Sequence, residues 1–393
     1  MKKLMRATSL ASVSLALSLS GVSALSSANA ASMRHTLNCY LADATQFNAM
    51  VSAKAKVVKG TTCPAKYTPN KFVSVAGNQL NIADQQGFYQ LFWATGIQAG
   101  IVNPATLGFK VHFDELLGPS IVSSVISGSD DITPVVSPAI WAESLDAGQK
   151  LTAVAVNQLV NPQNYWQVVV SPAGYQGGLT TPANLAGKKI AYVAGQDSQY
   201  VLDRLLASNN VAVNNYTFEN LPESSDLAAL FGGSVDAIVA SPITAAEAVA
   251  QGGKVIGNGA GILSGYDPIL MTPASVHNAA KMAMVAKYLY VSAQIDHWIL
   301  THQAAFTTII FNTFFAVQPS LNNPVGQALA AVLYQTGVNT FIPFTPAVTK
   351  EMGQEAIQLR VDGVLQKTPN LAASIDYSLT PELKVLAHVA SGH

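Results

Sequence analysis

The sequence predicts an α/β protein of two similar lobes, each a mostly parallel sheet flanked by helices, followed by a helical C-terminal region. Three observations support this fold class. A strand–turn–helix unit occurs twice. Short apolar runs of strand length alternate with helical patterns between residues 71 and 265, which is typical of parallel sheets covered by helices. From Ala279 onward the pattern is wholly helical.

The repeated unit is seen in Leu227–Lys254, LAALFGGSVDAIVASPITAAEAVAQGGK, and in Ser123–Lys150, SSVISGSDDITPVVSPAIWAESLDAGQK. Each copy predicts a glycine turn, a short buried strand and a helix that opens on Ser-Pro, because serine caps helices and proline suits their first turn. The matching positions are Gly128 and Gly233, Asp131 and Asp236, Ser137-Pro138 and Ser241-Pro242, and Glu143 and Glu247. Chance similarity of two ordinary α/β units is the alternative; a true repeat predicts two lobes of one design.

The first thirty residues predict a signal peptide. A basic start with Lys2, Lys3 and Arg6 is followed by the apolar stretch Leu10–Val22 and by the cleavage signal Ala28-Asn29-Ala30. We therefore expect cleavage near Ala30 and export to the periplasm as a soluble protein. An uncleaved membrane anchor is the alternative.

The composition argues against a nucleic-acid-binding protein and against a membrane-spanning one. The chain is 393 residues long, with 49% hydrophobic residues, 11% charged residues and a formal net charge of -1. No basic excess is available to follow phosphates, so no nucleic-acid partner is expected. Trp298–Val317 is the nearest approach to a membrane span after the leader, but His302, Gln303 and Asn312 suit a buried helix better. The length after cleavage is sufficient for two domains with separate cores.

Only two cysteines occur, Cys39 and Cys63. In an exported protein they predict a disulfide that clips an N-terminal extension, residues 31–70. Two unpaired thiols are the alternative. Two cysteines with His35 as a poor third ligand do not predict a zinc site.

The first lobe is expected to begin at residue 71 and run to 166. Its predicted elements are a strand Lys71–Ala76, a polar loop from Gly77 to Gly87, a helix Phe88–Ala99, a strand Lys110–Phe113, a helix from Gly118 to Ile126, the first repeat copy and a strand Lys150–Asn157.

The second lobe is expected over 167–265, entered through Tyr165–Pro172 and left through Gly265–Thr272. Its predicted elements are a turn at Thr181-Pro182, a strand Lys188–Val193, a helix to Ser208, a strand Tyr216–Glu219, the second repeat copy and a strand at Val255-Ile256. Residues 266–393 return to the first lobe and add helices. These are expected at Ala279–Val317, Pro324–Gly337, Pro346–Gln366 and Pro381–Val389, with Thr345 and Thr380 as caps.

No motif in the sequence predicts an enzyme or a cofactor. It has no G-x-S-x-G, H-E-x-x-H, Walker or G-x-G-x-x-G pattern. The seven histidines are scattered, and His297 and His302 are not spaced to form one ligand face. Asp131 and Asp236 form a possible acid pair. At the starts of their strands, however, we expect them to bind local backbone rather than to act in catalysis.

Ligands of open α/β sheets bind where helices begin at the carboxyl ends of strands, because free backbone N–H groups point there. The candidate ligand-binding residues are Asn78, Gly118, Pro119, Ser120, Ser137, Pro138, Gly195, Asp197, Ser198, Tyr200, Ser241 and Thr244. Hydroxyls and N–H groups suit a small polar or anionic ligand. Tyr200, Trp141 and Trp93 are either apolar walls of this cleft or core residues.

Three segments, in this order along the chain, resemble a known protein family: LAGKKIAYVAGQDSQYVLDRLLASNNV, LPESSDLAALFGGSVDAIVASPITAAEAVAQGGKVI and GNGAGILSGYDPILMTPASV. The chain resembles the nitrate/sulfonate/taurine-type solute-binding proteins of ABC importers from about Lys71 to Ala280, and GPSIVSSVISGSDDI matches the family's first lobe. The resemblance implies a type II, periplasmic-binding-protein-like fold. It also implies a monomer that delivers a small solute to a membrane permease, with ligand loops at Gly118-Pro119, Ser137-Pro138, Gly195–Tyr200 and Ser241-Pro242.

Two features depart from the family pattern. Ala240-Ser241 stands where many relatives have an aromatic and an acidic residue, and the extension 31–70 is additional. A related branch makes or binds thiamine pyrimidine precursors, but its enzymes use a cysteine-rich motif, and this chain has no cysteine after Cys63. A pyrimidine-binding protein, a ligand-sensing receptor and a secreted enzyme therefore remain as alternatives to an importer component.

Overall fold

The computed structural model describes residues 78–390, apart from 86–87, 117, 161, 163–164, 195, 213–214, 222, 316–325, 327–329, 332 and 335–338. Several predictions lie outside the described residues. They concern the signal peptide 1–30, the extension 31–70 with Cys39 and Cys63, the strand Lys71–Ala76 and most of the helix Pro324–Gly337.

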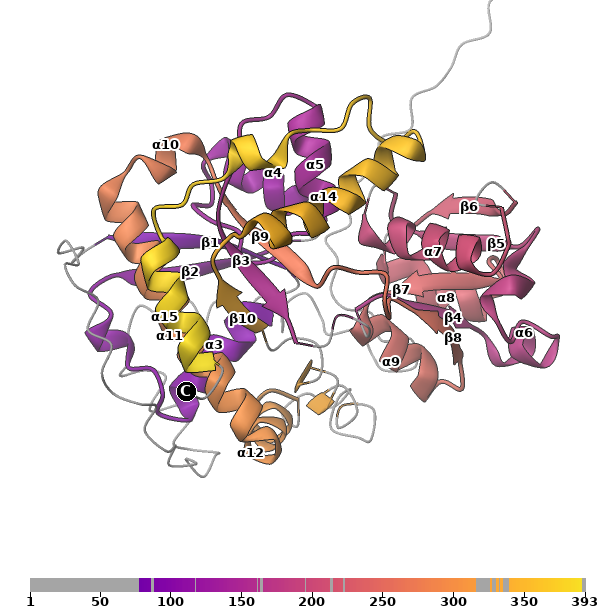
Figure 1. Cartoon of the computed structure of the whole chain (residues 1–393). Helices are drawn as coiled ribbons and strands as arrows, with labels where there is room; N and C mark the ends of the chain where they lie inside the picture. Colours follow the sequence, from indigo (N-terminus) through magenta and orange to yellow (C-terminus); the bar gives the residue numbers. More distant parts are fainter. Residues whose placement is uncertain are drawn as a thin grey trace, which may run out of the picture.

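The described chain forms two bodies joined by two crossing segments, which confirms the two-lobed α/β fold (Figure 1). We call the body built on the five-stranded sheet between Gln167 and Asn258 the second lobe, and the rest the first lobe. The strands are β1 Gln79–Gln85, β2 Lys110–Leu116, β3 Thr152–Leu159, β4 Gln167–Val170, β5 Lys189–Tyr192, β6 Thr217–Asn220, β7 Ala237–Ala240, β8 Lys254–Asn258, β9 Tyr266–Met271 and β10 Asn339–Ile342.

Helices flank the sheets of both lobes. The α-helices are α3 Phe88–Gln98, α4 Pro119–Ser127, α5 Pro138–Asp146, α6 Pro172–Gln176, α7 Asp197–Ser208, α8 Asp226–Phe231, α9 Pro242–Ala250, α10 Pro273–Val276, α11 Ala279–Thr301, α12 Gln303–Ile309, α14 Pro346–Val361 and α15 Thr380–Ala390. Shorter 3-10 turns lie at Pro104–Thr106, Pro182–Leu185, Glu223–Ser225 and Leu371–Ser374, and a π-helix at Ile310–Phe315. As expected, the Thr345 hydroxyl caps α14 by accepting from the Val348 N–H.

The sheets are mixed, so the prediction of mostly parallel sheets is wrong. In the second lobe the order is β6-β5-β7-β4-β8; β5 is parallel to β6 and β7, whereas β4 is antiparallel to β7 and β8. In the first lobe β3 is antiparallel to β9 and β10. The crossings explain the difference. The chain leaves the first lobe after β3 and returns on its neighbour β9, so these two strands must run in opposite directions. The same holds for β4 and β8.

Isolated bridges link the two sheets of the first lobe. Ile132 pairs in parallel with Ile82 of β1, and Thr133 pairs antiparallel with Leu270 of β9. The resulting order is β2, β1, residues 132–133, β9, β3 and β10, which matches β6, β5, β7, β4 and β8 of the second lobe position by position. The two lobes thus share one design, with β10 added to the first.

The repeat is confirmed in the hydrogen bonds of its glycine turns. Gly128 and Gly233 both adopt positive φ, 81° and 73°. In the first copy the N–H groups of Gly128 and Ser129 donate to the carbonyls of Val125 and Ser124. In the second copy those of Gly233 and Ser234 donate to Leu230 and Ala229. This paired pattern is the Schellman motif, which glycine permits because it has no Cβ.

Three element predictions are corrected. The expected loop 77–87 contains β1, whose polar residues concealed a strand that is buried in its second half. The expected helix Ala279–Val317 is broken at His302, whose ring stacks on Trp298 with centroids 5.1 Å apart. The expected wholly helical tail contains β10, a strand of only four residues that pairs with β3. None of the described helices combines the length and apolarity needed to cross a bilayer.

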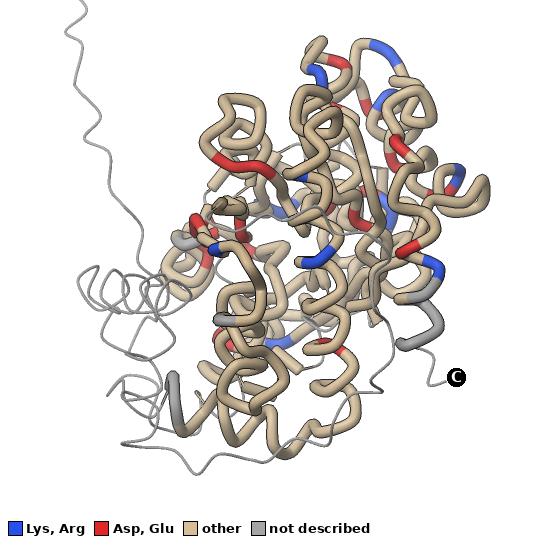
Figure 2. The backbone as a smooth tube through the Cα atoms, turned by 90° about the vertical axis from the view of Figure 1, so that its left-hand side faces the viewer, with Lys and Arg blue, Asp and Glu red and all other residues tan. Residues whose placement is uncertain are grey.

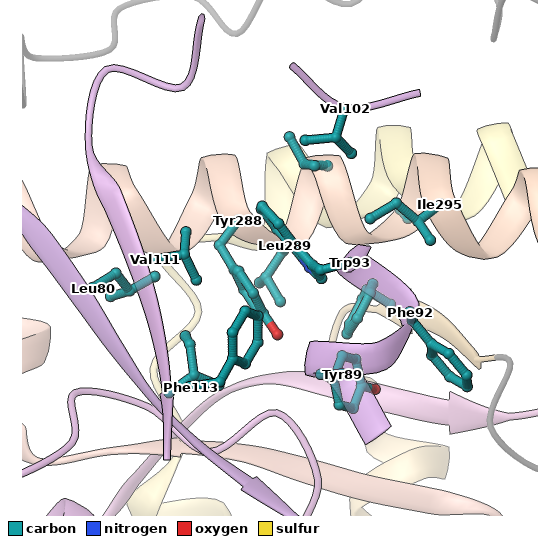
Figure 3. Packing of buried hydrophobic residues seen from close by; sticks show 14 of the residues in the cluster. Leu80, Tyr89, Phe92, Trp93, Val102, Val111, Phe113, Tyr288, Leu289 and Ile295 are labelled. Carbon is teal, nitrogen blue, oxygen red and sulfur yellow. The ribbon is translucent and has the colours of Figure 1, made fainter. Parts of the chain in front are cut away.

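The largest core lies in the first lobe, where α3 packs against α11 and the β1–β2 pair (Figure 3). Trp93 stacks on Tyr288 with ring centroids 5.2 Å apart, and the Trp93 indole N–H donates to the Ser292 hydroxyl at 2.8 Å. Trp141 is equally buried on the opposite face of the first-lobe sheet. Trp93 and Trp141 are therefore core residues and not walls of a cleft. Figure 2 shows the charged residues of both signs interspersed along the described chain.

Candidate functional site

A cavity lies at the boundary between the lobes. It is small, with a volume of about 20 Å³, and it is partly open to solvent. The lining residues are Gln85, Val135, Ser137, Ile140, Tyr165, Trp166, Gln196, Asp197 and Asp267. Both lobes and a crossing segment contribute, so any molecule held here contacts both bodies.

Helix beginnings from the two lobes meet at this cavity. Ser137 caps α5 of the first lobe, and its hydroxyl accepts from the Ile140 N–H at 3.3 Å. Asp197 is the first residue of α7 in the second lobe. Gly118, which precedes α4, adopts a φ of 53°, and a Cβ built on it would lie 2.6 Å from Gln196 Nε2. The lobes are thus in contact beside the cavity.

Asp197 is the most informative side chain of the site. It is 5% exposed, and its Oδ1 has no hydrogen-bond partner among the described residues. Burial raises its pKa to about 7, although a hydrogen bond with the Ser137 side chain acts in the opposite direction. Loss of water disfavours the charged carboxylate, which explains the direction of the shift. Near neutral pH this group exchanges protons easily.

Two further acidic side chains face Asp197. Burial and the charge of Asp197 raise the pKa of Asp267 well above its ordinary value. Glu355 of α14 is shifted in the same direction by burial, Asp197 and Asp267, while its Oε1 accepts from the Ser264 hydroxyl at 3.1 Å. Like charges at one site oppose ionisation of one another. The boundary between the lobes is therefore acidic and poorly solvated.

Two aromatic side chains form another wall. Tyr165 and Trp166 lie in the crossing segment before β4, with ring centroids 6.3 Å apart and planes at 77°. Trp166 is 5% exposed, and its indole N–H has no partner among the described residues. Burial and the charges of Asp267, Asp197 and Glu223 raise the pKa of Tyr165 well above its ordinary value. Tyr165 therefore stays a neutral hydrogen-bonding phenol.

The structure brings some of the sequence-predicted residues to this cavity. Ser137 and Asp197 line it, Gly118 contacts its wall, and Tyr200 of α7 is near enough to Asp197 and Glu355 for their charges to act on it. Pro119 and Ser120 are exposed at the start of α4, and Pro138 is buried in the first turn of α5. The Ser198 hydroxyl is fully buried and donates to the Val193 carbonyl, which is a structural role. Gly195 lies outside the described residues.

Other predicted residues are elsewhere. Asn78 precedes β1, whereas the cavity residue Gln85 ends that strand. The expectation placed Asn78 after a strand, and the observed strand follows it. Ser241 and Thr244 begin α9 but do not line the cavity. The Ser241 side chain makes no cap hydrogen bond, and its backbone N–H donates to Glu223 Oε1 at 2.9 Å.

Sequence reasoning missed four lining residues with polar or aromatic side chains, Gln85, Tyr165, Trp166 and Asp267, whereas Gln196 lies within the expected ligand loop Gly195–Tyr200. Tyr165, Trp166 and Asp267 lie in or beside the segments recognised as crossings between lobes. Since both crossings must pass the cleft, their polar and aromatic residues were the available signal. Among the described residues, no group of three His, Cys, Asp or Glu side chains is arranged to hold a metal ion.

Comparison with known proteins agrees with this architecture. A family model described as NMT1/THI5 like matches residues 108–273. No curated protein matches the sequence.

Solved structures share the fold. The periplasmic aliphatic sulphonate binding protein SsuA from Escherichia coli aligns with a TM-score of 0.62 at 20% identity, covering 77% of this chain and 92% of that one. The alkanesulfonate-binding protein SsuA from Xanthomonas axonopodis pv. citri, bound to MOPS, gives 0.64 at 19% identity, covering 77% and 99%. The desulfurization enzyme DSZB has the fold as well, with a TM-score of 0.53 at 13% identity over 79% and 99%.

The expected resemblance is thereby confirmed: the chain matches the NMT1/THI5-like family over residues 108–273, and its described part has the two-lobed fold of periplasmic sulfonate-binding proteins.

Proposed function

We propose that this protein is the exported, monomeric solute-binding component of an ABC importer. It captures a small polar organic solute between its lobes and presents it to a membrane permease. The observation that carries the proposal is the cavity itself, which is lined by Ser137 and Asp267 from the first lobe and by Gln196 and Asp197 from the second. A ligand that contacts both lobes favours the closed arrangement through its differential affinity.

The chemistry of the lining bears on which solute is captured. Nitrate or a sulfonate would need positive charge or free N–H groups, as at an open helix N-terminus. The cavity instead presents Asp197 and Asp267, and none of its described lining residues is Lys or Arg. Moreover, the first residue of α7 is the acidic Asp197, whose charge opposes an anion at this helix N-terminus. The lining therefore disfavours a simple anion and favours a solute that donates hydrogen bonds.

The proposal predicts closure on ligand binding. Small-angle scattering of the exported protein, free of co-purified solute, should show compaction when the correct solute is added, with no change of oligomeric state. Thermal stability should rise at the same time, because the ligand binds the folded protein and not the unfolded chain; about 2.7 kcal/mol is expected at a hundredfold excess over the dissociation constant.

A matched variant pair connects this change to the cavity. Asp197→Asn lies in the lining, whereas Asp203→Asn lies in the same helix beside Tyr216. Only the first should weaken ligand-induced compaction. A solute that stabilises the protein strongly and leaves the scattering profile unchanged would contradict the clamp. Such a result would favour a rigid pocket of the kind an enzyme or receptor uses.

A further inference from the structure

Buried atoms without partners point toward a specific kind of ligand. Oδ1 of Asp197 and Oδ2 of Asp267 have no hydrogen-bond partner among the described residues, although these side chains are only 5% and 4% exposed. A buried polar atom without a partner is costly, so native proteins rarely retain one without a reason. Both side chains line the same cavity, and both atoms accept hydrogen bonds from N–H donors.

We propose that the cavity binds a small organic cation with at least two N–H donors, such as a protonated amine or an amidine. This inference rests on the proposed function, because it names the solute class of the same cavity. The donors of the cation would satisfy the carboxyl oxygens of Asp197 and Asp267, and its single charge would compensate one ionised carboxylate while the other acid keeps its proton. Charge-assisted hydrogen bonds of this kind are about twice as strong as neutral ones.

The aromatic wall supports a cation independently of the carboxyl groups. Tyr165 and Trp166 meet almost at right angles, and both line the cavity. The face of an indole or phenol ring attracts a positive charge, most strongly where water is excluded. A neutral or negative ligand gains nothing from this attraction. Acid groups and aromatic rings therefore select for the same charge.

The ionisable groups around the cavity are mostly acidic, which favours a cation. Asp197 is faced by Asp267 from β9, Glu355 from α14, and Tyr165 from the crossing segment, and Glu223 acts on Tyr165. Arg204 of α7 acts on Tyr200, one turn along the same helix. None of the described lining residues is basic. In the empty cavity, burial raises the pKa of Asp267 well above its ordinary value and that of Asp197 to about 7, so a bound cation takes the place of a proton.

The size and geometry of the site narrow the ligand class. The cavity in this arrangement has a volume of about 20 Å³, room for about one water molecule, so an organic ligand enters only when the lobes move apart. A metal ion is a poorer occupant, since the described residues contain no group of three ligating side chains around one point. An organic monocation also makes use of Tyr165 and Trp166, which a metal ion does not require.

Probes of equal shape and different charge test the proposal. The full exported protein should be titrated by calorimetry with acetamidinium, acetamide and acetate, and with benzamidinium, benzamide and benzoate. Taurine and methanesulfonate represent the sulfonates. At least one amidinium should bind about tenfold or more tightly than its neutral and anionic counterparts. Equal affinity across charges, preference for an anion, or no amidinium binding at millimolar concentration would overturn the proposal.

Variants locate the bound cation. Asp197→Asn and Asp267→Asn are each expected to weaken amidinium binding about tenfold or more, because each removes a charged acceptor from the cavity. Asparagine has nearly the shape of the protonated acid, so both variants should fold, which circular dichroism would verify. Asp203→Asn is the matched control, since Asp203 is also buried in α7 but contacts the Tyr216 hydroxyl. Equal effects of all three substitutions would contradict the assignment.

The pH dependence of affinity has opposite signs for a cation and an anion. Because burial sets the pKa of Asp197 at about 7, protons compete with a cation below that pH. Amidinium affinity should therefore fall by up to about tenfold per pH unit as pH is lowered from 7, whereas an anion would bind more tightly. Small-angle scattering separates the two proposals. Compaction on adding a sulfonate would support the importer function and contradict the cation proposal. Cation binding without compaction would support the cation proposal and contradict the importer function.

Discussion

Asp236 and Lys189 are joined by two reciprocal hydrogen bonds. The Lys189 N–H donates to Asp236 Oδ2 at 2.8 Å, and the Asp236 N–H donates to the Lys189 carbonyl at 2.7 Å. The first lobe repeats this arrangement: Asn81 N–H donates to Asp131 Oδ2 at 3.0 Å, and Asp131 N–H donates to the Asn81 carbonyl at 2.9 Å. Each aspartate thus fastens the start of one strand to the neighbouring strand. This is the structural role expected for both aspartates.

Replacing Asp236 with alanine should destabilise the protein without changing ligand affinity. The substitution leaves the Lys189 N–H without its acceptor, which costs about 1–3 kcal/mol where the group is desolvated. Urea unfolding measures the loss, and calorimetry measures ligand binding on the same sample. If binding disappears while the protein remains fully folded, the cavity has been assigned to the wrong ends of the strands.

The two Ser-Pro helix starts provide a matched pair of substitutions. Ser137→Ala should cost about 1 kcal/mol in the free energy of unfolding, because the Ser137 hydroxyl accepts from the Ile140 N–H. Ser241→Ala should cost less, since that hydroxyl makes no cap hydrogen bond and only approaches the Thr244 hydroxyl at 3.5 Å. Only Ser137→Ala should weaken ligand binding. Equal losses of stability would show that capping does not separate the two sites.

Gly118→Ala tests the contact between the lobes. A Cβ at this position would lie 2.6 Å from Gln196 Nε2, and the φ of 53° disfavours any residue with a side chain. We expect the backbone strain to cost about 1 kcal/mol or more of stability. We also expect weaker ligand affinity, because the added methyl displaces the flexible end of the Gln196 side chain, which lines the cavity. The double variant Gly118→Ala/Gln196→Ala should recover the loss of affinity caused by crowding but not the backbone strain. A strictly additive double mutant would contradict the contact.

The stability of the protein should depend on pH through Asp84. Its two oxygens accept from the Tyr89 and Gln90 N–H groups at the start of α3. Burial raises its pKa to about 8, against the lowering effect of those hydrogen bonds. A raised pKa contributes stability that is present below the ordinary value of 3.8 and is lost as pH rises through about 8. The free energy of unfolding should therefore fall across this window.

Asp84→Asn supplies the control. The amide nitrogen cannot accept a hydrogen bond, so one N–H of α3 loses its partner at a cost of about 1–3 kcal/mol. With no proton to release, however, the variant should show a shallower decline with pH, by up to about 1.4 kcal/mol per pH unit. Denaturant unfolding between pH 4 and 8 measures both effects. An unchanged slope would mean that Asp84 does not titrate in this window.

The cysteine pair remains a prediction from sequence. Peptide mapping of the non-reduced protein from the periplasm should find Cys39 linked to Cys63, and reduction should release the two peptides. The closed loop would contribute about 3 kcal/mol if it is free of strain. Recovery of both cysteines as free thiols would exclude the clip.

The sequence by itself determined the repeated strand–turn–helix design. Gly128, Gly233 and Ser137 act through hydrogen bonds to backbone in the adjoining helix turn, and the two aspartates bind backbone in the neighbouring strand, so their meaning is local. The order of such units, together with the resemblance, was sufficient for the two-lobed fold. The direction of the strands could not be predicted from local sequence. Whether β4 or β9 runs parallel to its neighbours depends on where the chain crosses between the lobes.

Only the tertiary structure decided the character of the site. Gln85, Trp166, Asp197 and Asp267 are far apart in the sequence and meet only because both lobes and a crossing segment converge on one cavity. Sequence favoured a polar or anionic ligand, since hydroxyls and helix N–H groups were the visible features. Folding placed carboxyl groups there and removed their water. Desolvation belongs to the surroundings of a side chain and not to the side chain itself, so the acidic and poorly solvated character of the cavity appears only in three dimensions.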